Sequence, residues 1–249
     1  MKKLILSMVA IVLLASIFTA CGSKVEPLDT VKWINTTHAI LTEANGGDVD
    51  LFGGFPKNER NSADVKVLLE EWWGVTDRAS ADDMIEFLMK EGHRAGYANE
   101  MMLLKEDGVF DVSRQEAREI LKDFEFDDET VESYIAAMDA YETHGASAID
   151  AWDYTRALSL LSWYYLADYY TEEEALDKAL DIAKELQTLY TSWDEMAESY
   201  LTGYVYWSEE DPNDSSAEAF KRRKIYEKLK SRKNNPYAIA WNTTLEKTW

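Results

Sequence analysis

The feature that most constrains the fold is an uncharged run, ALSLLSWYYLA, at residues 157–167. Its apolar side chains would fall on every face of a helix, with no single stripe, and that pattern is typical of a helix buried on all sides. The run is too short to cross a bilayer, which requires about 20 apolar residues. It therefore predicts a central buried helix, at about 151–170, inside an all-α domain.

Helix-start signals recur around this run. The segments 171–174 and 192–195 each place a hydroxyl three residues before a carboxylate, which is the pattern of a capping box, and 80–83 and 113–116 repeat it. Alternation of period two is not sustained anywhere, so strands are not expected. The sequence predicts an all-α fold, a single multi-helix domain around the central helix. The other helices are expected near 31–41, 63–73, 81–91, 101–104, 114–126, 128–144 and 217–233, with breaks at Gly92 and Gly145.

The beginning of the chain has the pattern of a lipoprotein signal peptide. Two lysines precede an apolar run at residues 4–18, and Thr19-Ala20 lead into Cys21, which is the only cysteine. The site resembles a bacterial lipobox, so we expect residues 1–20 to be removed and Cys21 to carry lipid, palmitate included. Gly22-Ser23 resembles the start of a Gram-positive lipoprotein. The expected location is the outer face of the cell membrane.

The expected signal peptide and lipidation site, with the loop that ends at residue 61, divide the chain into three parts. They are the signal peptide at 1–20, a lipid-anchored tether with a first helix and a loop at 21–61, and an all-α domain at 62–249. With one cysteine, an intramolecular disulfide is impossible, so the exported domain must rest on its hydrophobic core.

The charge balance excludes one large class of partners. The formal net charge is −21, and loss of the two lysines with the signal peptide brings it to −23. Nucleic-acid binding depends on neutralisation of phosphates by Lys and Arg, so no nucleic-acid partner is expected. The expected partners are the membrane, through lipid on Cys21, and a protein, peptide or small-molecule ligand that the sequence does not identify.

A charged pair lies one turn before the uncharged run. Asp153 and Arg156 are three residues apart and so share a helix face, and burial in a central helix would require them to be paired. One interpretation is an ion pair that fixes the helix; the other is a polar site, joined by His144 and Asp150 from the turn at residue 145. A site requires an open cavity that reaches the pair, whereas a structural pair requires that Trp152 and neighbouring helices seal it.

Aromatic residues are the other candidate surface. Tyr and Trp on helical faces usually pack in cores, but their flat apolar faces and polar edges also suit carbohydrate and peptide sites. The residues concerned are Trp152, Trp193, Tyr200, Tyr204 and Trp207.

Motifs of catalysis and of cofactor binding are not found. The three histidines are far apart in sequence, and no HExxH pair, nucleophile elbow, P-loop or dinucleotide motif is present. We therefore assign no catalytic residue, and we expect neither a metal nor a cofactor.

Several segments, in order, resemble one family. AWDYTR, TEEEA and SWDEMAESYLTGYVYW, with WGVTDRASADDMIEFLMKEGHR upstream, are similar to the family called domain of unknown function 1266. The likeness covers roughly Trp72 to Leu245. It departs before the capping box at 171–174, where Asp168-Tyr169-Tyr170 replaces an expected glycine-containing turn. The family brings no activity with it.

Three hypotheses for function follow. The first is a non-enzymatic binding or interaction module at the cell surface. The second is an envelope enzyme, a hydrolase, with a polar site around Asp153 and Arg156. The third, suggested only by charge, is a protective partner of a basic toxin or peptide.

Overall fold

The computed structural model describes residues 29–249, and these fold into one all-α domain, which confirms the predicted class. The expected signal peptide, Cys21 and the following residues up to 28 lie outside the described residues. Among residues 29–249 there is no strand, and none of the helices is long and apolar enough to span a bilayer. The helices are α1 (Asp29–Thr37), α2 (Ala39–Ala44), α3 (Glu59–Trp73), α4 (Arg78–Lys90), α5 (Gly92–Glu106), α6 (Arg114–Asp123), α7 (Asp128–His144), α8 (Asp150–Leu166), α9 (Glu172–Leu189), α10 (Trp193–Ser208) and α11 (Glu218–Ser231), with short 3-10 turns η1 (Gly145–Ser147) and η2 (Pro236–Ala238).

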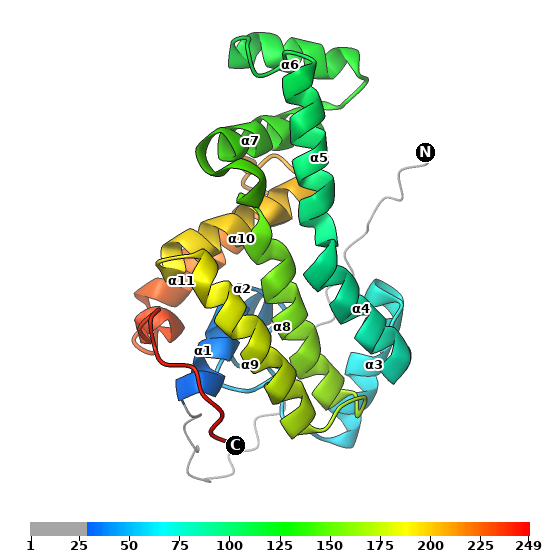
Figure 1. The fold of residues 1–249 in the computed structure, drawn as a ribbon, viewed down its shortest axis with the longest axis vertical. Coiled ribbons are helices and arrows are strands. Elements are labelled where there is room, and N and C mark those ends of the chain that lie inside the picture. Colours follow the sequence, from blue (N-terminus) through cyan, green and yellow to red (C-terminus); the bar gives the residue numbers. More distant parts are fainter. Residues whose placement is uncertain (1–28) are drawn as a thin grey trace.

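Helix α8 is the centre of the domain, as the uncharged run predicts. Every residue of α8 is buried except Asp150 and Tyr165. It packs against α9, α10 and α4, and Figure 1 shows it in the middle of the body of the molecule. Because helices cover it on all sides, its side chains can be apolar all round.

Helices α5, α6 and α7, which we call the arm, extend from one end of the body (Figure 1). Helix α5 carries the chain outward, α6 packs on α7, and α7 returns against α10. The arm thus meets the body where α5 begins and where α7 passes into α8.

The core also includes the first helices, which precede the expected boundary at residue 61. Trp33 of α1 has no exposed surface, and its ring lies 5.0 Å from that of Trp193 and 5.1 Å from that of Trp241. Its indole N–H donates to the Trp241 carbonyl at 2.9 Å. Helix α1 and the C-terminal segment are therefore packed together at Trp193, the first residue of α10.

Several helix boundaries differ from the sequence expectation, among them the start of α3 at Glu59 rather than at 63, and three of the differences have a cause in the structure. Helix α4 begins at Arg78, because the Asp77 carboxylate accepts the backbone N–H of Ser80 and so caps the helix. Ser80, the expected cap, instead accepts the backbone N–H of Asp77 as the third residue of the helix. Helix α6 ends at Asp123, where the next residues turn through Glu125 at a φ of 65°. The expected first helix is two helices, which join at His38.

The turn before α9 explains how the chain manages without a glycine there. Asp168 has a φ of 61°, in the left-handed region that glycine usually fills at the end of a helix. Its carboxylate accepts a hydrogen bond from the Ser62 hydroxyl at 3.0 Å and pairs with Lys57 at 2.7 Å. These contacts compensate for the strain of a non-glycine residue in this conformation.

Candidate functional site

Asp153 lies on α8 at the base of the arm and has no exposed surface. Its two carboxylate oxygens accept the backbone N–H groups of His93 and Arg94, at 3.0 Å and 2.9 Å. These are early residues of α5, a helix whose own N-cap residue, Glu91, supplies no side-chain hydrogen bond. Asp153 is thus the N-terminal cap of α5, and its negative charge lies at the positive end of that helix.

Gly92 makes this approach possible. A Cβ atom at residue 92 would lie 2.2 Å from the Asp153 Oδ2 atom, and the φ of +61° is one that glycine adopts without strain. The glycine expected to break the chain before α5 therefore also leaves the space that the carboxylate occupies.

Arg156 neutralises Asp153 from the same helix, as the spacing of three residues predicts. Its Nη2 atom lies 2.5 Å from the Asp153 Oδ1 atom, and its Nε–H donates to the Trp152 carbonyl at 3.1 Å. The guanidinium carbon is 4.1 Å from the ring centre of Trp152 and 5.5 Å from that of Trp73. The cation is 6% exposed and lies over two indole rings, an arrangement that stabilises a desolvated charge.

Burial affects both members of the pair. For Asp153, burial acts to raise the pKa, but the charge of Arg156 and the hydrogen bonds from the backbone N–H groups of His93 and Arg94 together hold the pKa below its ordinary value. For Arg156, burial lowers the pKa, and the charge of Asp153 opposes that shift. The pair is therefore ionised at neutral pH and bound tightly within the fold.

His93 extends the pair to the surface. Arg156 Nη2 lies 2.8 Å from His93 Nδ1, and because a guanidinium can only donate, Nδ1 accepts and the ring proton is on Nε2. The His93 side chain is 33% exposed. It is the one member of the Asp153–Arg156–His93 group that a solvent molecule or ligand can reach.

Arg94 also belongs to this group. Its Nη1 atom lies 3.4 Å from the Asp153 Oδ2 atom, and it donates to the Leu88 carbonyl at 2.5 Å. The sequence interpretation did not include His93 or Arg94. The signal that points to them is Gly92, since a glycine before a helix with no local cap leaves room for a cap from elsewhere.

Of the other two candidates for this site, Asp150 lies near the pair and His144 lies apart from it. Asp150 is the first residue of α8, and burial raises its pKa, whereas the charge of Arg94 and a hydrogen bond from Ser147 lower it. His144 is exposed at the end of α7, and no described residue links it to Asp153. The structure therefore brings Asp153, Arg156 and Asp150 together around Arg94, and replaces His144 with His93.

Four of the five candidate aromatic residues are in the core. Trp152, Trp193, Tyr200 and Tyr204 are between 2% and 7% exposed, so they present no open ring face to a ligand. Trp207 is 44% exposed, and its ring lies 5.7 Å from that of Trp152. Of the expected aromatic surface, Trp207 alone is accessible.

Close helix packing accounts for the burial of Trp152. A Cβ atom at Gly203 of α10 would lie 2.3 Å from the Cβ atom of Trp152. The glycine therefore brings α10 against α8, which encloses the indole.

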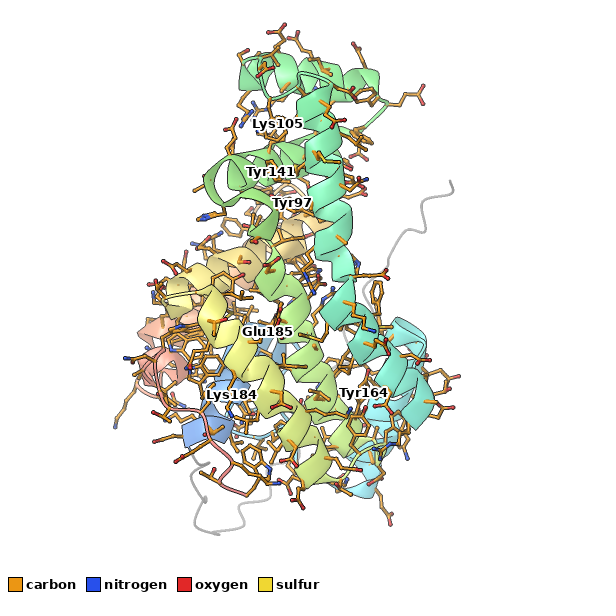
Figure 2. All side chains as sticks on the ribbon, viewed as in Figure 1. Tyr97, Lys105, Tyr141, Tyr164, Lys184 and Glu185 are labelled. Carbon is orange, nitrogen blue, oxygen red and sulfur yellow. The ribbon has the colours of Figure 1, made fainter. Side chains whose placement is uncertain are left out.

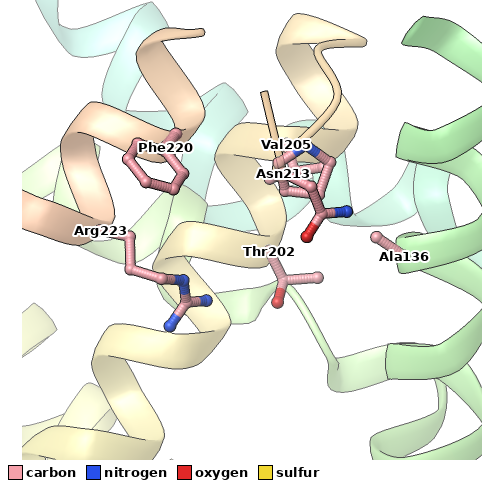
Figure 3. A pocket seen from close by; sticks show the side chains of 7 residues that line it. Ala136, Thr202, Val205, Asn213, Phe220 and Arg223 are labelled. Carbon is pink, nitrogen blue, oxygen red and sulfur yellow. The ribbon is translucent and has the colours of Figure 1, made fainter. Parts of the chain in front are cut away.

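Two open pockets lie elsewhere on the described part of the chain, and neither is lined by Asp153 or Arg156. One has a volume of about 320 Å³ between α7, α10 and α11, and Figure 3 shows Thr202 and Asn213 at its centre, with Phe220 and Arg223 on one side. The other has a volume of about 460 Å³ and lies on the arm. Among residues 29–249, no group of three or more His, Cys, Asp or Glu side chains is arranged to hold a metal ion.

Comparison with known proteins gives a family but no function. No curated protein and no solved structure matches the chain significantly. The family described as protein of unknown function (DUF1266) matches residues 68–241. This range includes α8 with Asp153 and Arg156, and all three helices of the arm. Since the match spans more than half of the sequence, the chain belongs to the DUF1266 family.

Proposed function

We propose that this protein is an exported lipoprotein, anchored through Cys21 to the outer face of the cell membrane, that acts as a non-enzymatic binding module. The proposal for its location rests on the sequence before residue 29: two lysines, an apolar run and a lipobox-like site that ends in the only cysteine. The proposal for binding rests on the geometry of the domain.

The observation that supports a binding role over catalysis at the pair is that protein groups already occupy both oxygens of Asp153. Its carboxylate accepts two backbone N–H groups of α5 and contacts two guanidinium groups, so its oxygens have no free position for a substrate. Trp152 and the neighbouring helices enclose it, which is the arrangement required of a structural pair. The open pockets, by contrast, are lined by mixed apolar and polar side chains, which suit recognition of a ligand.

The location is tested by replacement of the anchor. Cells that express the full chain should retain it in the membrane fraction and incorporate labelled palmitate, whereas Cys21→Ser should abolish the label and release the protein. Lys24→Ser, three residues further on, is the matched control and should change neither result. A Cys21→Ser protein that is still extracted only with detergent would contradict the proposed anchor.

One observation favours the alternative, an envelope hydrolase. His93 is partly exposed, and Arg156 fixes its ring so that the protonated Nε2 atom remains available. A histidine oriented by a buried charge is a common arrangement for a general acid or base. In that case His93 would transfer the proton, and Asp153 and Arg156 would position it.

The two functions predict different results for one variant. His93→Gln removes the acid–base group while it keeps a polar side chain beside Arg156. If the protein is a hydrolase, this variant should lose turnover of ester and amide substrates and retain its melting temperature. If the protein is a binding module, wild type should show no turnover that depends on His93, and His144→Gln should behave as His93→Gln does.

A further inference from the structure

The larger of the two pockets lies on the arm, between the end of α5, the loop that follows it and the end of α7. It has a volume of about 460 Å³ and is lined by Lys105, Phe110, Asp111, Tyr141, Glu142 and Gly145. Figure 2 shows Lys105 on α5 and Tyr141 on α7 in this part of the arm. The pocket is open to solvent and large enough for a single small molecule.

Aromatic rings form its apolar wall. The rings of Phe110 and Tyr141 are 5.7 Å apart in an edge-to-face arrangement, and Tyr97 lies 6.1 Å behind Tyr141. Phe110 and Tyr141 are half-buried, so each ring is held by the core and still has accessible surface. Such a wall suits an apolar or aromatic group of a ligand.

One of the acidic groups beside this wall already has a cationic partner. Arg114 donates through Nε to the Asp139 carboxylate at 2.7 Å and through Nη2 to that of Glu142 at 2.6 Å. Because one guanidinium is shared by two carboxylates, this group keeps one net negative charge beside the pocket, which favours a ligand that carries a cation.

Two charges of opposite sign remain in the same pocket. Lys105 has no ion pair or side-chain hydrogen bond with any described residue, although the other Lys and Arg side chains of the arm and its base are paired with Asp or Glu. The Asp111 carboxylate likewise has no partner among residues 29–249, and no ion pair joins it to Lys105. The Tyr141 hydroxyl is also without a hydrogen-bond partner there. The pocket thus offers separate sites for an anion and for a cation beside one apolar wall.

We infer that this pocket binds a small zwitterion, an α-amino acid with an apolar or aromatic side chain. The ligand carboxylate would pair with Lys105 and accept a hydrogen bond from Tyr141, the ammonium group would pair with Asp111, and the side chain would lie against Phe110. A ligand with a carboxylate alone is disfavoured, because a chain with a net charge of −21 repels anions. In a zwitterion the ammonium group balances the charge of the ligand's own carboxylate. This inference rests on the proposed binding function and specifies its ligand class.

The test is titration calorimetry of the full chain in detergent micelles with L-phenylalanine and two blocked derivatives. N-acetyl-L-phenylalanine lacks the ammonium group, and L-phenylalaninamide lacks the carboxylate. Each should bind about 2- to 5-fold more weakly than L-phenylalanine, as expected for loss of one partly exposed ion pair. Free carboxylate and free ammonium are thereby tested one at a time.

Variants connect each ligand group to its residue. Lys105→Met should bind L-phenylalanine and L-phenylalaninamide equally weakly and still reject the N-acetyl compound. Asp111→Asn should bind L-phenylalanine and N-acetyl-L-phenylalanine equally weakly and still reject L-phenylalaninamide. The matched controls are Lys184→Met and Asp181→Asn on α9, which remove exposed charges of the same signs far from the arm and should leave all affinities unchanged.

Two outcomes would overturn the inference. One is that L-phenylalanine shows no saturable binding up to about 10 mM, the weak end of ligand affinities. The other is binding that Lys105→Met and Asp111→Asn weaken no more than their controls do. Either result with Cys21-dependent anchoring intact would remove the ligand assignment and leave the proposed surface binding function standing.

Discussion

Replacement of Asp153 by Asn should destabilise the fold severely. Asn has the shape of Asp but no charge, so Arg156, which is 6% exposed, would lose its counter-ion inside the core. One oxygen would also become an NH₂ group, although both oxygens accept a backbone N–H of α5. Loss of one member of a buried pair costs about 3–5 kcal/mol, which for a domain of this size lowers the melting temperature by about 6–20 °C.

Arg156→Met should cost less, which makes the comparison informative. The carboxylate would keep the two α5 amides and the Arg94 guanidinium, and Met would still fill the space between the rings of Trp73 and Trp152. We expect a loss of about 1–3 kcal/mol. The double variant should be more stable than the sum of the two losses predicts by at least about 1 kcal/mol, because neither charge is then left alone.

The measurement is urea unfolding of the full chain and its three variants at neutral pH, followed by far-UV circular dichroism. The free energies of unfolding give the coupling directly. The reasoning would be refuted if Asp153→Asn lost less than about 1 kcal/mol, or if the losses of Asp153→Asn and Arg156→Met were additive. Either result would mean that the pair is kept for a role other than stability, and His93 would become the first residue to test for catalysis.

Three further predictions use matched positions and the same unfolding assay. Gly92→Ala should cost at least about 2 kcal/mol more than Gly74→Ala, because both have a positive φ but only the first Cβ atom would overlap another group, at 2.2 Å. Gly203→Ala should destabilise the protein by about 1–3 kcal/mol, because the added Cβ atom would lie 2.3 Å from the Trp152 Cβ atom. Gly96→Ala, also within a helix but with the nearest atom at 3.7 Å, should stabilise the protein by up to about 1 kcal/mol. Equal effects at the two sites would contradict the close approach of α10 to α8. Burial lowers the pKa of His38 from 6.5 to about 4, so the unfolded chain takes up a proton at a higher pH than the folded protein does. The free energy of unfolding should therefore fall by about 3 kcal/mol as the pH drops from 6.5 through 4. His38→Gln should remove that part of the pH dependence, and an unchanged slope would show that His38 is not buried in its neutral form.

The parts of the fold that the sequence predicts are those set by neighbouring residues. Thr171 and Glu174 form the reciprocal capping box that their spacing indicates, and α9 begins there. Ser192 likewise accepts the Glu195 amide at the start of α10. The uncharged run predicts α8 and its burial because a helix with no polar face has no stable position at the surface.

The caps that the sequence does not reveal come from distant residues. Helix α8 has no side-chain cap from Ile149, the residue before it. Instead the Ala151 N–H donates to the Tyr190 hydroxyl at 2.9 Å and to that of Ser199 at 3.1 Å. No local pattern marks a hydroxyl that lies 39 or 48 residues away as the partner of an amide. The same holds for Asp153 and α5. The pairing of Asp153 with Arg156 was predictable from their spacing, whereas its second task, capping the N-terminus of α5, was not.

That second task connects the buried group to the candidate binding pocket. Asp153 fixes the first turn of α5, and α5 carries Lys105 to the pocket near its other end. A helix is a stiff element, so loss of its cap at the base displaces what it carries at the tip. Asp153→Asn should therefore weaken ligand binding on the arm even in molecules that remain folded, although Asp153 does not line the pocket. A decrease in binding on substitution of Asp153 is thus no sign of a site at the pair, and only variants that line the pocket, compared with stability-matched controls, identify where a ligand lies.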